Sequence, residues 1–283
     1  MNSLSESVAI VTGGGSGIGE GLCRELARRG ARVVVADINS GDAGRVAQAI
    51  TDNGGQATAS TVDVSVEEEV TRLVEQTAAR YGRLDYLFNN AGIAIGGDAR
   101  DLTLDHWRRV LDVDLYGVLY GMRAAYPIMV RQGFGHIVNT SSAGAFFPAP
   151  GNAPYCTAKH ALVGLSLSLR LEGADLGVKV SCVCPGFVRT NIYRNADGAG
   201  LALPADVSEE QATGAPAKMM APDRAAQLIL DGVTRNKAMM VFPASVRWGR
   251  HVVRLVPGLS DRILLRQWRA LRRYRTTAEQ VAG

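Results

Sequence analysis

Tyr155 and Lys159 are the residues whose types and spacing best suit proton transfer. They lie in the segment APYCTAKHAL, and a separation of four residues puts both side chains on one face of a helix. A free phenol has a pKa of about 10, so it acts as a base at neutral pH only if about 4 kcal/mol stabilises its phenolate. The Lys159 ammonium and a bound cationic group could together supply this, and the phenolate could then accept a proton from an alcohol. A surface Tyr–Lys pair without a chemical role is the alternative.

A serine at the end of a predicted strand favours the chemical interpretation. The run GHIVNTSS predicts a strand that ends at Ser142, thirteen residues before Tyr155. The Ser142 hydroxyl could hold a substrate oxygen beside the phenol. Ser141 is the less favoured candidate for this role, because neighbouring side chains of a strand point to opposite faces.

A glycine-rich loop, TGGGSGIG, separates the first predicted strand from a helix. Glycines let the backbone approach a pyrophosphate, whose charge is stabilised by the free N–H groups at the start of the following helix. The glycine spacing departs from G-x-G-x-x-G and the loop lacks the GK[ST] ending of a P-loop, so a purely structural turn is the alternative. The residues of this loop that we expect to contact a dinucleotide are Gly13, Ser16, Gly17, Ile18 and Gly19.

Two aspartates follow later strands and could bind the adenosine half of a dinucleotide. Asp37 ends the second predicted strand, where a carboxylate can accept hydrogen bonds from a ribose diol. A 2′-phosphate would be repelled there, and no basic residue precedes Gly17 or directly follows Asp37, so we expect NAD rather than NADP. Asp63 and Val64 end the third predicted strand, where Asp63 could reach the adenine amino group. An aspartate that caps the next helix is the alternative for Asp63.

Alternating strands and helices must position these groups. From Val8 onward, short and nearly continuous apolar runs alternate with ten or more residues of helical periodicity. This pattern predicts an α/β protein with a Rossmann-like, doubly wound parallel sheet that binds ligands at the carboxyl ends of its strands. We expect a single domain over residues 1–245 and a helical, basic and amphipathic C-terminal extension over residues 246–283.

The combined motifs resemble the short-chain dehydrogenase/reductase family over about residues 5–245. The motifs that match in order are TGGGSGIG, Asp37, Asp63-Val64, Asn89-Asn90-Ala91-Gly92, Ser142, Tyr155-x-x-x-Lys159 and Pro185-Gly186 with Thr190. The resemblance implies a homotetramer or homodimer. It also implies that Tyr155 and Lys159 contact the cofactor, with Lys159 holding the nicotinamide ribose. The other cofactor contacts that it implies are Asn90, Ala91 and Gly92 at the adenosine ribose, and Pro185, Gly186, Val188 and Thr190 at the nicotinamide.

Asp114 departs from the family pattern, in which Asn usually stands two residues before the Tyr116-Gly117 step. By the resemblance, that Asn helps to seat a water in a proton relay from the lysine. An ionised Asp114 could not donate a hydrogen bond, and its charge would partly offset the effect of Lys159 on the phenol. We expect reduced or alkaline-shifted activity that Asp114→Asn restores. A tolerated near-isostere without kinetic effect is the alternative.

The expected activity is NAD-dependent interconversion of a secondary alcohol and a ketone, with Tyr155 as general acid/base, Ser142 orienting the carbonyl and Lys159 tuning the phenol. The segment 191–222, read as a mobile lid or an ordinary insertion, carries Leu201, Leu203, Met219 and Met220. These residues favour a hydrophobic substrate, such as a steroid- or lipid-like alcohol. A regulatory or scaffold protein that binds NAD and has weak or lost turnover is the alternative.

The C-terminal segment concentrates positive charge. Residues 247–275 hold nine Arg and one Asp, whereas the whole 283-residue chain has a net charge of only +4. Helical spacing separates these arginines from apolar residues such as Trp248 and Trp268, which suits peripheral contact with an anionic membrane. A helix packed on its own domain or on a neighbouring subunit is the alternative. No nucleic-acid recognition fold accompanies the charge, so we expect no nucleic-acid partner.

The rest of the chain indicates a cytoplasmic protein, which the basic segment could bring to a membrane. It opens without a basic signal region, and no apolar run reaches the roughly 18 residues of a membrane span. The four cysteines have no metal-binding spacing, and the histidines lie near no cysteine pair. We expect packed thiols in a reducing compartment and no metal.

Overall fold

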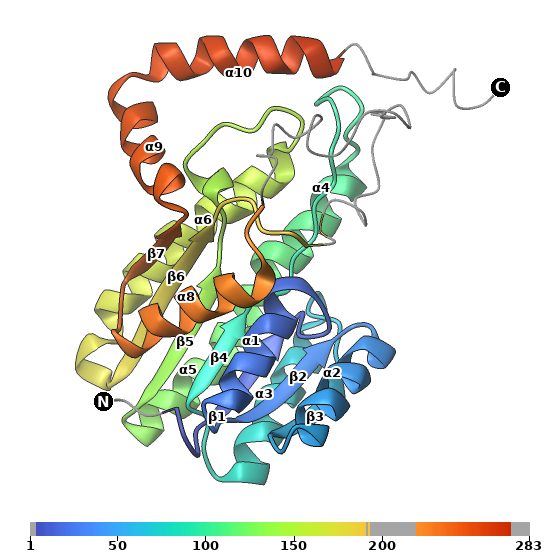
Figure 1. Cartoon of the computed structure of the whole chain (residues 1–283), viewed down its shortest axis with the longest axis vertical. Coiled ribbons are helices and arrows are strands. Elements are labelled where there is room, and N and C mark those ends of the chain that lie inside the picture. Colours follow the sequence, from blue (N-terminus) through green and yellow to red (C-terminus); the bar gives the residue numbers. More distant parts are fainter. Residues whose placement is uncertain (1–3, 191, 193–218, 273–283) are drawn as a thin grey trace, which may run out of the picture.

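A parallel sheet organises the chain, which is described as a computed structural model over residues 4–190, 192 and 219–272 (Figure 1). The sheet has seven strands in the order β3-β2-β1-β4-β5-β6-β7, with every neighbouring pair parallel. The strands are β1 (Val8–Thr12), β2 (Arg32–Asp37), β3 (Gln56–Thr61), β4 (Tyr86–Asn89), β5 (Gly135–Thr140), β6 (Val178–Pro185) and β7 (Met239–Phe242). The predicted doubly wound α/β fold is confirmed.

Helices cover both faces of the sheet. One face packs against α1, α2 and α8, and the other against α3, α5 and α6. A π-helical turn at Asp112–Tyr116 joins α4 to α5. The helices are α1 (Gly17–Arg28), α2 (Ser40–Asp52), α3 (Glu67–Tyr81), α4 (Leu104–Leu111), α5 (Gly117–Gln132), α6 (Ala153–Glu172), α8 (Pro222–Thr234), α9 (Ala244–Leu255) and α10 (Pro257–Leu271).

The central strands are buried because their side chains pack into hydrophobic cores on both faces of the sheet. In β1, Ala9 and Val11 face the core shared with α1 and α8, whereas Val8 and Ile10 face the core shared with α3 and α5. This alternation is the two-residue period of a strand, and it explains why the central strands are apolar at nearly every position. β3 lies at an edge and is only half-buried. Since all seven strands are parallel, their carboxyl ends meet at one edge, where the candidate site lies.

The third strand is shorter than predicted. It ends at Thr61, so Asp63 and Val64 lie in the loop before α3 rather than at the strand end. Asp63 accepts hydrogen bonds from the backbone N–H and the hydroxyl of Ser65, at 2.9 and 2.7 Å. These local bonds compete with strand pairing and turn the chain toward α3. Asp63 is not the N-cap of that helix, because Val66 occupies the position.

Two helices follow the last strand and extend beyond the carboxyl edge of the sheet (Figure 1). α9 begins two residues after β7, and α10 follows α9 after Val256. The helical extension expected after residue 245 is therefore present as these two helices. Most of the expected lid, 191–222, including Leu201 and Leu203, lies outside the described residues, whereas Ile192, Met219 and Met220 are described.

Two of the cysteines are buried side by side in β6. Cys182 and Cys184 lie on the same side of β6 with their sulfurs 3.7 Å apart, and both are buried free thiols. Within the ranges that the structure describes, no group of three or more potential metal-binding side chains occurs. Over those same ranges, no helix combines the length and apolar character needed to cross a bilayer.

Candidate active site

The glycine-rich loop turns between β1 and α1 in a way that only glycine allows. Gly13 and Gly17 have φ angles of +63° and +52°, where a side chain is strained. A Cβ on Gly19 would lie 1.9 Å from the Gly13 carbonyl oxygen, so the third glycine permits the loop to close on the first turn of α1. The N-cap Ser16 makes no side-chain capping hydrogen bond, which leaves the first N–H groups of α1 available to an anion.

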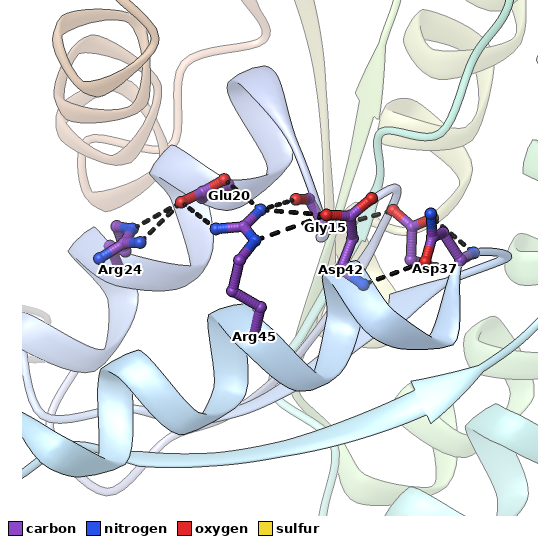
Figure 2. A network of polar contacts seen from close by, with 7 residues as sticks. Gly15, Glu20, Arg24, Asp37, Asp42 and Arg45 are labelled. Carbon is purple, nitrogen blue, oxygen red and sulfur yellow. Dashed lines mark hydrogen bonds and ion pairs between the residues drawn. The ribbon is translucent and has the colours of Figure 1, made fainter.

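Asp37 ends β2 beside this loop and is fixed by two backbone donors. One of its carboxylate oxygens accepts a hydrogen bond from the Gly15 N–H at 2.9 Å, and the other from the Asn39 N–H at 3.0 Å. Figure 2 shows the carboxylate directed at the loop. Each carboxylate oxygen has more than one acceptor site, so the group remains able to bind ribose hydroxyls. Its position next to the phosphate loop suits the adenosine ribose of a dinucleotide.

An arginine from α2 holds the opposite side of the same loop. Arg45 donates to the Gly15 carbonyl oxygen at 2.7 Å, and it pairs with Glu20 at 3.0 Å (Figure 2). Glu20 also pairs with Arg24 at 2.7 Å, and Asp42 lies 3.4 Å from Arg45. Gly15 is therefore held through its N–H by Asp37 and through its carbonyl by Arg45. The two carboxylates near Arg45 neutralise its charge within the network.

Polar side chains after β4 tie the loop to the sheet. The Asn90 N–H donates to Thr12 Oγ1, at the end of β1, at 3.0 Å. Its amide also donates to the Thr12 carbonyl at 3.1 Å. Asn89 is buried and donates to Asn139 at 2.9 Å, which links β4 to β5. These bonds fix the position of the turn that follows β4.

Ser142 and Tyr155 meet after β5 and at the start of α6. Ser142 lies two residues beyond the strand, and its hydroxyl accepts a bond from the Gly144 N–H at 3.1 Å. Ser142 and Tyr155 line the same cleft, and the Ser142 hydroxyl acts to lower the pKa of the Tyr155 phenol. Ser141 also borders the cleft, but it is buried and its hydroxyl donates to the Lys159 carbonyl at 2.7 Å, so it supports α6.

The environment of Tyr155 favours the protonated form of its phenol. Burial raises the pKa of Tyr155 well above its ordinary value, and the charge of Asp114 raises it further, while the Ser142 hydroxyl acts in the opposite direction. The Lys159 ammonium lies 5.4 Å from the centre of the Tyr155 ring. These side chains by themselves therefore do not lower the pKa of the phenol, as a general base at neutral pH requires.

Asp114 forms an ion pair with Lys159 and so offsets the effect of the ammonium on the pKa of the phenol. Lys159 is 3% exposed, and its Nζ lies 3.0 Å from Asp114 Oδ2 and donates to the Thr140 carbonyl at 3.1 Å. Asp114 is fully buried, and its Oδ1 accepts a 2.7 Å bond from the Ile93 N–H. Burial raises the pKa of Asp114, although the Lys159 ammonium and the Ile93 N–H act to lower it.

Local backbone structure places this buried pair. The π-helical turn between α4 and α5 turns Asp114 into the protein, as such turns often do at functional sites. Gly92 lies against the pair, because a Cβ there would be 3.3 Å from both Asp114 Oδ2 and Lys159 Nζ. A larger residue at 92 would press on the ion pair.

One cleft of about 330 Å³ brings these groups together at the carboxyl edge. It contains every residue that the sequence assigns to the site except Gly19 and Asp114, which lie behind its wall. The predicted residues that line it are Gly13, Ser16, Gly17, Ile18, Asp37, Asp63, Val64, Asn90, Ala91, Gly92, Ser142, Tyr155, Lys159, Pro185, Gly186, Val188 and Thr190.

Several described residues of the cleft were not predicted. Four are neighbours of a predicted residue in the chain, so adjacency was the available signal: Ile38, Val62, Ile93 and Phe187. Thr140 precedes Ser141, which was the less favoured candidate for the role of Ser142 and which also lines the cleft. Val113 and Ile192 also line the cleft. Arg45 lies outside the cleft but holds its glycine loop, and nothing in its spacing from the loop indicates that contact.

The residues present fit a nicotinamide dinucleotide. The loop and Asp37 offer backbone N–H groups for a pyrophosphate and a carboxylate for a ribose. The cleft also contains Tyr155 and the buried Lys159, which offers a cation beside the phenol ring.

Comparisons with known proteins agree with this geometry. The family described as short chain dehydrogenase matches residues 7–199. Cyclohexanol dehydrogenase from Acinetobacter sp. is 38% identical over 191 residues, which cover 67% of this chain and 76% of that protein. Meso-2,3-butanediol dehydrogenase from Serratia marcescens is 36% identical over 189 residues, which cover 67% and 74%.

A solved structure extends the similarity over most of the chain. The short-chain dehydrogenase/reductase from Burkholderia phymatum, in complex with NAD, superposes with a TM-score of 0.79 at 28% sequence identity. The match covers 90% of this chain and 96% of that one.

Proposed function

The chain belongs to the short-chain dehydrogenase family, and we propose that it is an NAD-dependent oxidoreductase that interconverts a secondary alcohol and a ketone. The observation that carries this proposal is the meeting of Ser142, Tyr155 and Lys159 in the cleft that also contains the glycine loop and Asp37. A proton-transfer group and a dinucleotide site in one cleft are the two requirements of hydride transfer to or from an alcohol carbon.

The side chains divide the work as follows. Ser142 hydrogen-bonds the substrate oxygen and keeps it beside the phenol. Tyr155 takes the hydroxyl proton during oxidation and returns it during reduction. A bound oxidised nicotinamide supplies the hydride acceptor. Lys159 would hold the cofactor ribose. Its ammonium stabilises the phenolate electrostatically, to the extent that Asp114 leaves the charge uncompensated.

The environment of Tyr155 favours reduction over oxidation at neutral pH. A phenol whose pKa is raised is protonated and ready to act as a general acid toward a ketone. Alcohol oxidation needs the phenolate. Its rate is therefore expected to keep rising to a higher pH than it would in a protein whose Lys159 had no carboxylate partner.

NAD is favoured over NADP by the charges around the adenosine ribose site. Asp37 would repel a 2′-phosphate, and Arg45, the arginine nearest to it in Figure 2, is already paired with Glu20 and Asp42. A cation that carboxylates neutralise offers little attraction to an added phosphate.

The substrate is proposed to be a hydrophobic alcohol or ketone, such as a lipid- or steroid-like molecule. Apolar side chains share the cleft with Ser142 and Tyr155, and they are Ile93, Val113, Phe187 and Ile192. The names of the two relatives, which act on cyclohexanol and on 2,3-butanediol, support a neutral alcohol. A homodimer or homotetramer, as the family resemblance implies, is part of the same proposal.

Cofactor titration followed by a substrate panel tests the function. We expect NADH to bind more tightly than NADPH when nicotinamide fluorescence is followed, and cyclic and long-chain secondary alcohols to reduce NAD. Tighter binding of NADPH would refute the role given to Asp37. NADH binding without turnover over the whole panel would instead favour a regulatory protein, for which the Asp114–Lys159 pair is the supporting observation.

A further inference from the structure

α9 presents an apolar stripe to solvent on the side opposite to its packed face. Three residues spaced as neighbours on one side of α9 and the residue that follows the helix form this stripe, and Leu255 is 80% exposed and Trp248 67% exposed. The members of the α9 stripe are Trp248, Val252, Leu255 and Val256. Large apolar side chains that cluster on a surface usually mark a binding site.

The orientation of this stripe is fixed, because the opposite side of α9 is attached to the domain. Gly249 lies against the Phe147 ring, to which its Cβ would approach within 3.1 Å. Arg250 stacks 5.4 Å from the Phe146 ring centre and donates toward Met239 Sδ at 3.0 Å. The packed face thus leaves the α9 stripe directed away from the protein.

α10 is attached in the same way at its far end. Trp268 is 8% exposed and packs on Gly151, where a Cβ would lie 3.0 Å from the indole. Arg272 pairs with the buried Asp98 at 3.1 Å. The pair of helices is therefore attached to the domain through α9 and through the far end of α10, and both lie beyond the carboxyl edge of the sheet (Figure 1).

The charge around the stripe is strongly positive. Residues 244–272 contain seven arginines and a single aspartate. Arg247 and Arg254 flank the stripe on α9, and both are exposed. On α10, Arg262, Arg266 and Arg269 are exposed on the side away from Trp268. In the described part of the chain, none of these five arginines has an ion-pair partner.

We propose that the α9 stripe and its flanking arginines dock the protein on an anionic lipid surface. An interfacial helix buries apolar side chains, among them Trp, at the level of the headgroups while arginines contact lipid phosphates. A second copy of the chain fits the stripe less well, because an isologous contact through α9 would bring Arg247 and Arg254 of both copies together.

Vesicle sedimentation of the full-length protein tests this proposal, and it needs neither cofactor nor substrate, so it is independent of the oxidoreductase activity. We expect binding to vesicles of equal parts phosphatidylcholine and phosphatidylglycerol at low salt, and release at high salt. Trp248→Ser with Leu255→Ser is expected to weaken binding about tenfold or more, since two apolar anchors are lost. Leu171→Ser is the matched control, because Leu171 is 78% exposed on α6.

The charge contribution needs its own variants. Arg247→Gln with Arg254→Gln is expected to weaken binding by roughly tenfold or more, at about fivefold for each cation at the surface. Arg72→Gln with Arg131→Gln removes two exposed arginines elsewhere and should leave binding unchanged. Absence of sedimentation at low salt, or equal loss in the control variants, would overturn the proposal. So would a Trp248→Ser, Leu255→Ser protein whose molar mass in solution halves while vesicle binding is unaltered, because that result identifies a second copy as the occupant.

Discussion

Replacing Asp114 by Asn should move the pH dependence of alcohol oxidation toward neutrality. A unit charge 5.4 Å from the phenol, the distance of Lys159 Nζ from the ring centre, acts with about 3 kcal/mol at an effective dielectric constant of 20. This energy equals about two pKa units. Asp114 Oδ2 lies 3.0 Å from the same Nζ, so an ionised carboxylate cancels much of the effect.

The sign of the shift follows from which form of Tyr155 reacts. Oxidation needs the phenolate, and an uncompensated Lys159 ammonium stabilises the phenolate and lowers the pKa of Tyr155. With about half of the Coulomb energy restored, the alkaline limb of kcat against pH should move down by about one unit in Asp114→Asn. The rate at neutral pH should then rise up to about tenfold, because tenfold more enzyme carries the phenolate.

Two measurements accompany the pH profile. NADH affinity should stay within about threefold of wild type, because Asp114 lies behind the wall of the cleft. Asp85→Asn is the matched control, since Asp85 is also a buried carboxylate but lies before β4, at the opposite edge of the sheet, where it accepts a bond from the Val8 N–H at 2.9 Å. A pH profile that Asp114→Asn leaves in place, or moves to higher pH, would refute the electrostatic reasoning.

Three further predictions concern the cofactor site and the core. Asp37→Asn should reduce the preference for NADH over NADPH about tenfold, measured by fluorescence titration; an unaltered preference would exclude charge repulsion as its origin. Arg45→Gln should weaken NADH binding about tenfold, because the Gly15 carbonyl loses a charged donor, whereas Arg24→Gln, which reaches only Glu20, should change it less. Burial lowers the pKa of His136 to about 3 in the folded protein, from about 6.5 for an exposed histidine. Below about pH 6.5 the unfolded chain therefore binds more protons than the folded protein. The free energy of unfolding should fall there by up to about 1.4 kcal/mol per pH unit. Urea unfolding should show a shallower decline in His136→Asn, and parallel declines would contradict this.

The sequence predicts the fold well because its strongest signals are local. Apolar runs such as VAIVT alternate with helical segments, and the parallel order follows from that alternation. The site benefits from the same rule, since residues that follow different strands must converge at one edge. Asp63 shows the limit of the approach, because its side-chain bonds to Ser65 end β3 earlier than the apolar pattern indicates.

Contacts between distant segments could not be predicted. Arg45 reaches the Gly15 carbonyl across thirty residues of chain only because α2 packs beside α1, and no spacing rule describes that approach. The C-terminal segment is similar: helical spacing places Trp268 on an apolar side, but its burial depends on the shape of the loop at Gly151. Sequence alone could therefore not decide between contact with a membrane and packing on the protein's own domain for either helix. In the structure Trp268 is buried and Trp248 is exposed.

The most direct test of the proposed activity compares wild type with Tyr155→Phe in one experiment. Each protein is first titrated with NADH and then mixed with NAD and a reactive alcohol such as cyclohexanol, while NADH formation is followed by absorbance. We predict nearly equal NADH affinity and a loss of turnover of about a thousandfold or more in Tyr155→Phe, because the proton acceptor is gone while the dinucleotide site is intact. Turnover that survives the substitution, with NADH binding unchanged, would contradict the assignment of Tyr155 as the general acid/base.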